Sequence, residues 1–271
     1  MAQYIHFLTN NATTLPTDLW VPSTDKVKPM LSEQWAIGLT KTMYNEKIEI
    51  SLEGYLKKMN GVIEYLDGAG YLNSAIEKWD NKVEAGKGKS MGMELLLKKE
   101  FGKTTGWVGY TLSKSTRKFP TINSGKEFYF KFDRRHTFVI VALHQFNQNL
   151  EVSASWQFQT GTPFTLPTAQ YESTNGQSPF EIPYEFPYNL LFNYQSRNTF
   201  RLLNYHRLDA GITWKKQKKY GERSWNLGAY NVYNRKNPFY YYLDSEFKNN
   251  RGLKGVSILP FVPSISYRIK F

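Results

Sequence analysis

The sequence contains no cysteine among its 271 residues. This absence excludes a disulfide framework and any metal or redox site that depends on thiolate ligands. The chain also lacks an apolar run of about 18 residues, which excludes a transmembrane helix. Its mean hydropathy is −0.54. Such a low average does not exclude a transmembrane barrel, because lipid-facing and lumen-facing residues alternate along barrel strands and their hydropathies cancel.

Acidic residues are scarce relative to basic ones, with 23 Asp and Glu against 35 Lys and Arg, so the formal net charge is +12. In a soluble protein this excess would indicate a nucleic-acid partner. No basic helix or nucleic-acid motif accompanies the charge here. The cations gather instead in turns and at strand ends, as at Lys98, Lys99, Lys103 and 215–219. We therefore expect lipid headgroups, and no nucleic acid, to meet them.

Histidine is also rare. The four histidines are His6, His136, His144 and His206, and their spacing does not match a metal site. We predict no catalytic residue, no metal and no cofactor, and hence a protein that is not an enzyme. The first residues lack the charged and apolar regions of a signal peptide.

What the sequence has in abundance is alternation between apolar and polar residues, in a chain that is 16% aromatic. The clearest stretches are 150–159 and 265–271, the second of which ends on Phe271. A period of two is typical of strands with one apolar and one polar face. Short turns near 44–46, 100–103 and 146–149 alternate with long loops at 59–86, before Asp133, at 160–204 and at 244–252.

This pattern predicts an all-β fold, an antiparallel up-and-down transmembrane β-barrel of about ten strands, with short turns on one rim and long loops on the other. Residues 1–30 are predicted to form an extended loop, and 31–271 the barrel. In the stretch 137–145 both the odd-numbered and the even-numbered positions are mostly apolar. The pattern therefore does not decide which of these side chains face the lipid. A soluble sandwich or propeller is the alternative, in which the apolar faces would pack on a second sheet.

Nine stretches, taken in order, resemble the C-terminal part of the barrel of a TonB-dependent outer-membrane receptor of the Bacteroidetes type. They lie at 15–22, 32–34, 86–94, 106–115, 133–136, 160–163, 205–209, 230–238 and 264–271. The resemblance implies about ten strands of a larger barrel of about 22 strands, in the bacterial outer membrane. An N-terminal plug domain would occlude that barrel.

The resemblance further implies substrate binding on the extracellular side and energy from the proton gradient, delivered by TonB, ExbB and ExbD through the plug. The sequence offers no candidate for the plug or the first half of the barrel. We therefore expect a fragment with an internal start at Met1. Its expected partners are outer-membrane lipid, the plug and N-terminal barrel half, and the barrel-assembly machinery. The resemblance also allows a surface lipoprotein as a partner.

The longest loop is rich in aromatic residues, whose rings offer a large contact area for a ligand at low entropic cost. They are equally suited to packing the loop on itself. The substrate-loop candidates are Phe164, Tyr171, Phe180, Tyr184, Phe186, Tyr188 and Tyr194.

Four charged residues are candidates for roles in the lumen or at its rim. Arg134 and Arg135 follow a loop, either as an anion-binding patch or, as we prefer, within an ion-pair network that positions the strand. Arg207 and Asp209 lie two apart on one strand face and are expected to form a lumen ion pair. At the chain end, Tyr267, Ile269 and Phe271 resemble the strand signal that the barrel-assembly machinery reads.

We thus expect part of an importer of a scarce nutrient, such as a siderophore, vitamin, glycan or peptide. Two alternatives stay open from the residues: a self-contained small outer-membrane barrel acting as an adhesin or structural protein, and a soluble carbohydrate-binding β module.

Overall fold

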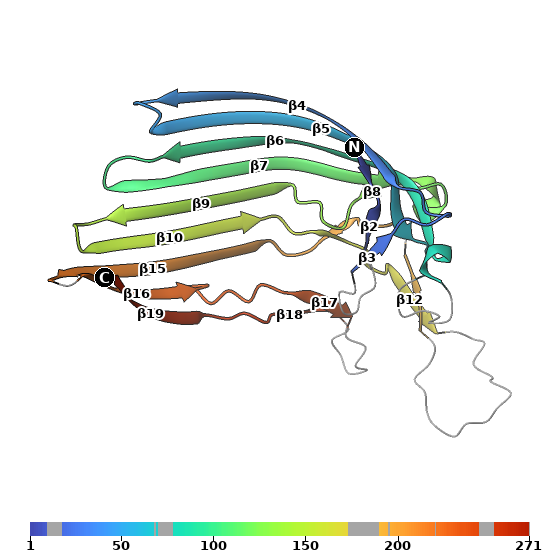
Figure 1. The fold of residues 1–271 in the computed structure, drawn as a ribbon. Coiled ribbons are helices and arrows are strands. Elements are labelled where there is room, and N and C mark those ends of the chain that lie inside the picture. The colour runs from blue at the N-terminus through green and yellow to red at the C-terminus, as the bar shows by residue number, and fades with distance from the viewer. Residues whose placement is uncertain are drawn as a thin grey trace, which may run out of the picture.

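The computed structural model describes residues 1–9, 18–67, 69, 78–172, 190–194, 196–219, 221–243 and 252–270. Its main element is one curved antiparallel sheet of 11 strands, in the order β1-β4-β5-β6-β7-β9-β10-β15-β16-β19, with β8 paired to β7 (Figure 1). Its strands are β1 (Ala2–Gln3), β4 (Met30–Met43), β5 (Ile48–Tyr65), β6 (Val83–Lys99), β7 (Thr104–Lys118), β8 (Phe128–Tyr129), β9 (His136–Gln145), β10 (Leu150–Gln159), β15 (Tyr205–Lys218), β16 (Gly221–Tyr230) and β19 (Val262–Lys270).

Shorter elements stand beside this sheet, within the described ranges, as two-stranded sheets and 3-10 turns. They are β2 (Ile5–Leu8) with β3 (Leu19–Pro22), β11 (Pro163–Phe164) with β14 (Phe200–Arg201), β12 (Ala169–Glu172) with β13 (Leu190–Asn193), β17 (Tyr240–Leu243) with β18 (Leu253–Val256), η1 (Trp79–Asn81) and η2 (Ile122–Gly125). None of the helical turns in these ranges is long and apolar enough to cross a membrane.

The predicted all-β antiparallel architecture is confirmed, including the alternation of connections. Short turns join β4 to β5, β6 to β7, β9 to β10 and β15 to β16 at one rim, and the long connections gather at the other rim (Figure 1). The short β4–β5 turn places Tyr44, Asn45 and Glu46 at φ values of 52°, 54° and 64°. Three successive left-handed residues reverse the chain tightly, although side chains disfavour that conformation.

The strand register settles the facing of β9, which the sequence left open. Phe138 is opposite Phe158, whereas Val139 is opposite Gln157. Phe138, Ile140 and Ala142 therefore share the apolar outer face, while Val139 and Val141 face the polar lumen side, since successive side chains alternate between faces. One row of this outer face runs across six strands through Leu39, Leu52, Leu95, Tyr110, Phe138 and Phe158.

Several stretches differ from the expected organisation. The long loop expected over 59–86 is shorter, because β5 extends to Tyr65 and β6 begins at Val83. The first 30 residues, expected as an extended loop, contain β1, β2, β3 and the start of β4. A strand was also expected over 237–243. The strand found there, β17, begins at Tyr240 and pairs with β18 in a separate hairpin. The sheet has open edges in the described part of the chain, because its end strands β1 and β19 do not pair with each other and β1 covers only the start of β4.

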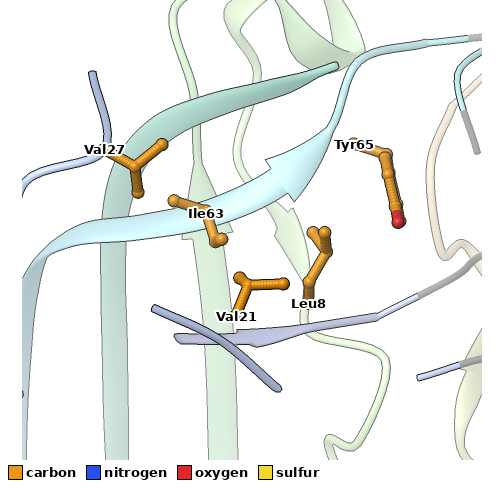
Figure 2. Packing of buried hydrophobic residues seen from close by; sticks show 5 residues of the cluster. All are labelled: Leu8, Val21, Val27, Ile63 and Tyr65. Atoms are coloured by element: carbon orange, nitrogen blue, oxygen red, sulfur yellow. The ribbon is translucent and has the colours of Figure 1, made fainter. Parts of the chain in front are cut away.

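The buried core lies at the long-loop end, where the first residues of the chain cover the end of β5. Leu8 and Val21 of the β2–β3 hairpin pack against Ile63 and Tyr65 of β5, together with Val27 (Figure 2). A second cluster joins Val62 to Phe119, Ile122 and Phe128. These two clusters hold the loops in a fixed position relative to the ends of the strands.

Candidate functional site

Three consecutive aromatic residues at and after β8 form the centre of the loop-side site. Each of them lies beneath an arginine. The guanidinium carbon of Arg197 is 5.7 Å from the ring centroid of Phe128. Arg201 lies 5.1 Å above Tyr129, and Arg117 lies 3.8 Å above Phe130. Cation–π contacts of this kind attach the 196–201 segment and β7 to the same three residues, 128–130.

The carboxylate of Asp133 anchors one of these arginines. Asp133 is 2% exposed, and its Oδ2 accepts a hydrogen bond from Nη2 of Arg201. Nη1 of Arg201 also donates to the carbonyl oxygen of Gly161 over 3.1 Å. The other carboxylate oxygen, Oδ1, accepts from the backbone N–H of Ser115 on β7. A buried carboxylate thereby joins β7 to the long β10–β15 connection.

Arg197 makes a parallel set of contacts with the end of β5. Its Nη1 lies 3.6 Å from Oε1 of Glu64, whose side chain is 2% exposed, and its Nη2 lies 3.3 Å from Oδ1 of Asp67. Nη2 also donates to the carbonyl oxygen of Tyr65 over 3.1 Å. Arg197 and Arg201 are four residues apart, so one short segment carries both anchors.

Asn198 completes the docking of this segment. Its Nδ2 donates to the carbonyl oxygen of Tyr129 over 2.8 Å, and its own N–H donates to Oγ1 of Thr165 over 3.0 Å. Asn198 has a φ of 53°, a left-handed conformation that asparagine tolerates better than most residues. The turn therefore lets the two arginines flank a buried amide.

The predicted rim arginines lie beside this cluster. Nη1 of Arg134 donates to the carbonyl oxygen of Thr160 over 3.3 Å, and burial lowers the pKa of its guanidinium. Arg135 lies 5.6 Å above the ring of Tyr129 and 4.0 Å from Oδ2 of Asp133. Both arginines thus contact loop and carboxylate groups of the protein. Their assignment to ion pairing or to anion binding stays a prediction.

The structure brings the predicted pair Arg207 and Asp209 together on the lumen face of β15. Nη2 of Arg207 lies 2.8 Å from Oδ2 of Asp209, and Nη1 donates to the hydroxyl of Tyr230 over 2.6 Å. Oδ1 of Asp209 accepts from the N–H of the fully buried Asn231 over 2.9 Å. The pair therefore also fixes the turn that follows β16.

The substrate-loop candidates are only partly within the described residues. Phe164 is opposite Phe200 in the β11–β14 pair, Tyr171 is opposite Leu191 in the β12–β13 hairpin, and Tyr194 is 47% exposed. Phe180, Tyr184, Phe186 and Tyr188 lie outside the described residues. Their role as ligand contacts stays a prediction.

The C-terminal candidates lie on the outer edge strand. Tyr267 and Ile269 are 43% and 42% exposed on the same face of β19, and the ring of Tyr267 lies 4.6 Å from that of Trp225. Phe271 lies outside the described residues. Recognition of this strand by the assembly machinery stays a prediction.

The residues at the centre of the site are not among those predicted from the sequence: Glu64, Arg117, Phe128, Tyr129, Arg197 and Arg201. One signal was available. Residues 128–135 place four aromatic residues next to one lysine, one aspartate and two arginines. Such a mixture in a loop is typical of a polar and aromatic cluster more than of a solvated connection. No pattern in the sequence around Arg197 and Arg201 indicates that they contact residues 128–135.

The side chains of the site are charged, polar and aromatic. Nowhere in the part of the chain that the structure describes do three or more His, Asp or Glu side chains gather as metal ligands would. The cluster offers guanidinium groups, tyrosine hydroxyls and aromatic faces, which bind polar and anionic groups.

The sequence matches the family described as TonB dependent receptor-like, beta-barrel, over residues 6–234. The chain belongs to this family. The barrel is therefore an outer-membrane receptor barrel, which confirms the predicted location. Membership in a receptor family also confirms the prediction that the chain is not an enzyme. No match to a curated protein reaches significance.

Solved structures show the same fold. The ferripyoverdine receptor of Pseudomonas aeruginosa, bound to ferripyoverdine, is 15% identical with a TM-score of 0.57, over 90% of this chain and 28% of the receptor. The ferric citrate transporter FecA, in its unliganded form, is 12% identical with a TM-score of 0.51, over 88% of this chain and 30% of the transporter. The receptor barrel described here thus spans less than a third of either relative.

Proposed function

We propose that the chain forms the C-terminal part of the barrel of a TonB-dependent importer of the Bacteroidetes type. A scarce nutrient would bind on the long-loop side and enter with energy from the proton gradient, delivered by TonB, ExbB and ExbD through a plug domain. The observation that carries this proposal is the docking of the 196–201 segment on β8 through Arg197 and Arg201. It holds part of the longest loop in a fixed place at the mouth of the lumen, as a binding surface requires.

The open sheet supports the larger assembly. The part of β4 that β1 does not cover and the whole of β19 present backbone hydrogen-bonding groups at an edge, and a membrane leaves no water to satisfy such groups. Strands from the remainder of a full barrel would cover both edges. The coverage of 28% and 30% of the solved relatives supports the same interpretation.

The proposed substrate class is a siderophore, vitamin, glycan or peptide. Exposed rings such as Tyr194, three residues before Arg197 in the chain, suit a ligand that presents both flat and polar surfaces. The proposed partners are outer-membrane lipid, the plug with the N-terminal barrel half, the TonB system, the barrel-assembly machinery and a surface lipoprotein.

Reading the coding DNA upstream of Met1 tests the assembly directly. An in-frame plug domain and signal peptide are expected there. A stop codon directly upstream, followed by a ribosome-binding site, would contradict the proposal.

The import function is tested with the intact receptor in cells that depend on it for uptake of labelled nutrients. Uptake of one nutrient is expected to require TonB and to stop when the proton gradient is dissipated. The double variant Arg197→Met/Arg201→Met should weaken nutrient binding while the barrel still inserts into the outer membrane. Uptake that persists without TonB would refute the energy source that we propose.

A further inference from the structure

Two cations face each other on the outer surface of the barrel near the short-turn rim. Lys216 of β15 and Arg223 of β16 are direct cross-strand partners, and both are exposed. Each lies two residues from a tryptophan on its own strand, Trp214 and Trp225 respectively, so all four side chains share one face. Lys218, two residues beyond Lys216, adds a third exposed cation to this face.

This face is the lipid-facing one. Trp214, Trp225 and Tyr267 form a row across three strands and are 60%, 48% and 43% exposed. The next row toward the middle of the sheet is aliphatic, with Ile212 opposite Leu227 and Leu227 opposite Ile265. Aromatic residues that border an apolar band mark the membrane–water interface. Lys216 and Arg223 lie one row closer to the turn, about 7 Å further along the strands, at the depth of the headgroups.

No acidic side chain among the described residues of β15, β16 and β19 lies on this face to neutralise the two cations. Like charges directly opposite each other destabilise a sheet. The neighbouring acidic residues face the lumen: Glu222 lies on the other side of β16, and Glu151 pairs with Lys215 at 3.3 Å. Within the described ranges, neither Lys216 nor Arg223 takes part in an ion pair.

We propose that Lys216 and Arg223, assisted by Lys218, bind the phosphate of an anionic glycerophospholipid whose acyl chain lies along Trp214 and Trp225. An arginine fork fits two phosphate oxygens at once, and lysine adds a point charge. Short turns face the periplasm in this class of barrel. The bound lipid therefore belongs to the periplasmic leaflet of the outer membrane. A zwitterionic headgroup is a poorer match, because its own cation would meet the same positive surface.

The test uses the intact receptor in mixed micelles, with native mass spectrometry to count bound phosphatidylglycerol and phosphatidylcholine. The wild type is expected to retain phosphatidylglycerol preferentially. The double variant Lys216→Gln/Arg223→Gln should bind it roughly 25-fold more weakly, since each cation near an anionic lipid surface contributes about a factor of five. The conservative variant Arg223→Lys should keep most of the preference, because it keeps the charge.

The matched control is Arg268→Gln/Lys270→Gln on β19. These two cations lie at the same rim but face the lumen, opposite Ser224 and Glu222. The control should bind phosphatidylglycerol like the wild type, and the heat-dependent gel mobility of folded barrels verifies that every variant is folded. Equal retention of the two lipids by the wild type would overturn the proposal. So would equal weakening of lipid binding in the lumen-facing control, or undiminished binding in Lys216→Gln/Arg223→Gln. The site is independent of the imported nutrient, so the test does not rely on transport.

Discussion

Arg201 donates a hydrogen bond from its guanidinium to the buried carboxylate of Asp133, 68 residues earlier in the chain. The pair joins the long β10–β15 connection to the segment that leads into β9. Asp133 has a second donor in the N–H of Ser115, and Arg201 has further acceptors in the carbonyl oxygens of Asp133 and Gly161. This contact therefore controls how three separate segments meet at the mouth of the barrel.

Truncation of Arg201 should loosen this meeting point. Arg201→Met leaves the Asp133 carboxylate with one fewer charged partner in a buried place, and we expect a local loss of about 2 kcal/mol. The measurement is hydrogen exchange of the 112–118 peptide, which should speed up markedly. Adding Asp133→Asn to Arg201→Met should recover part of the protection, because the buried charge is then removed as well. If the double variant loses as much protection as the sum of the single variants, the two residues do not act as a pair.

Gly161 allows a close backbone crossing. A Cβ atom at this position would lie 1.7 Å from the carbonyl oxygen of Leu202, so the backbone has to move. Gly161→Ala is expected to separate β11 from β14 and to destabilise the loop end by about 3 kcal/mol. Protease cleavage near Arg201 should accelerate in this variant. Gly252→Ala is the control, since a Cβ there meets nothing within 4 Å; similar cleavage rates for the two variants would contradict the close contact.

The lipid-facing assignment predicts opposite outcomes for two neighbouring residues of β19. Ile265 is 67% exposed on the apolar face, whereas Ser266 faces the lumen, opposite Asn226. Ile265→Lys should destabilise the inserted barrel by about 2–4 kcal/mol, while Ser266→Lys should have little effect. Denaturant unfolding of the intact receptor in lipid vesicles measures both. Equal tolerance of the two lysines would favour a soluble fold over a membrane barrel.

His6 predicts a pH response of the β2–β3 hairpin. Its ring is buried, its Nε2 lies 3.1 Å from Oγ of Ser23, and burial lowers its pKa below the usual value of 6.5 even though a backbone hydrogen bond at Lys28 raises it. The unfolded segment therefore binds a proton more readily than the folded one. The stability contributed by the neutral ring is complete above pH 6.5 and is lost as the pH falls through the lowered folded value.

Trypsin cleavage after Lys26, four residues beyond the end of β3, reports on this hairpin. Relative to a reference peptide, which corrects for the pH dependence of trypsin itself, cleavage should speed up between pH 7.5 and pH 5.5. His6→Gln should flatten the response, whereas His144→Gln at the opposite rim should leave it intact. A response that survives His6→Gln would assign it to another group.

Local patterns in the sequence were enough to predict most strands of the main sheet. Strict alternation, as in Leu150–Gln159, identifies both the strand and its two faces, because the side-chain period of two is set by the backbone alone. The same pattern failed over 137–145, where both parities are apolar. Only the pairing of Phe138 with Phe158 and of Val139 with Gln157 assigned the faces there.

The loop end was less predictable. Arg207 and Asp209 could be paired from the sequence, since they are two residues apart on one strand face. The contacts of Arg197 with Glu64 and of Arg201 with Asp133 join residues that are far apart in the chain, and nothing local links them. Similarly, the first residues of the chain look extended in sequence, yet Leu8 and Val21 are buried because the end of β5 supplies the surface that covers them.

The sequence by itself determined that this chain forms an antiparallel sheet with one apolar and one polar face and without disulfides. It also determined that the chain carries cations and aromatic residues suited to a membrane interface. These properties follow from composition and from a backbone period that each strand expresses on its own. The tertiary structure decided which loops meet and which arginine reaches which carboxylate. It also placed Lys216 opposite Arg223, because cross-strand register and loop docking depend on contacts between segments that the order of residues does not bring together.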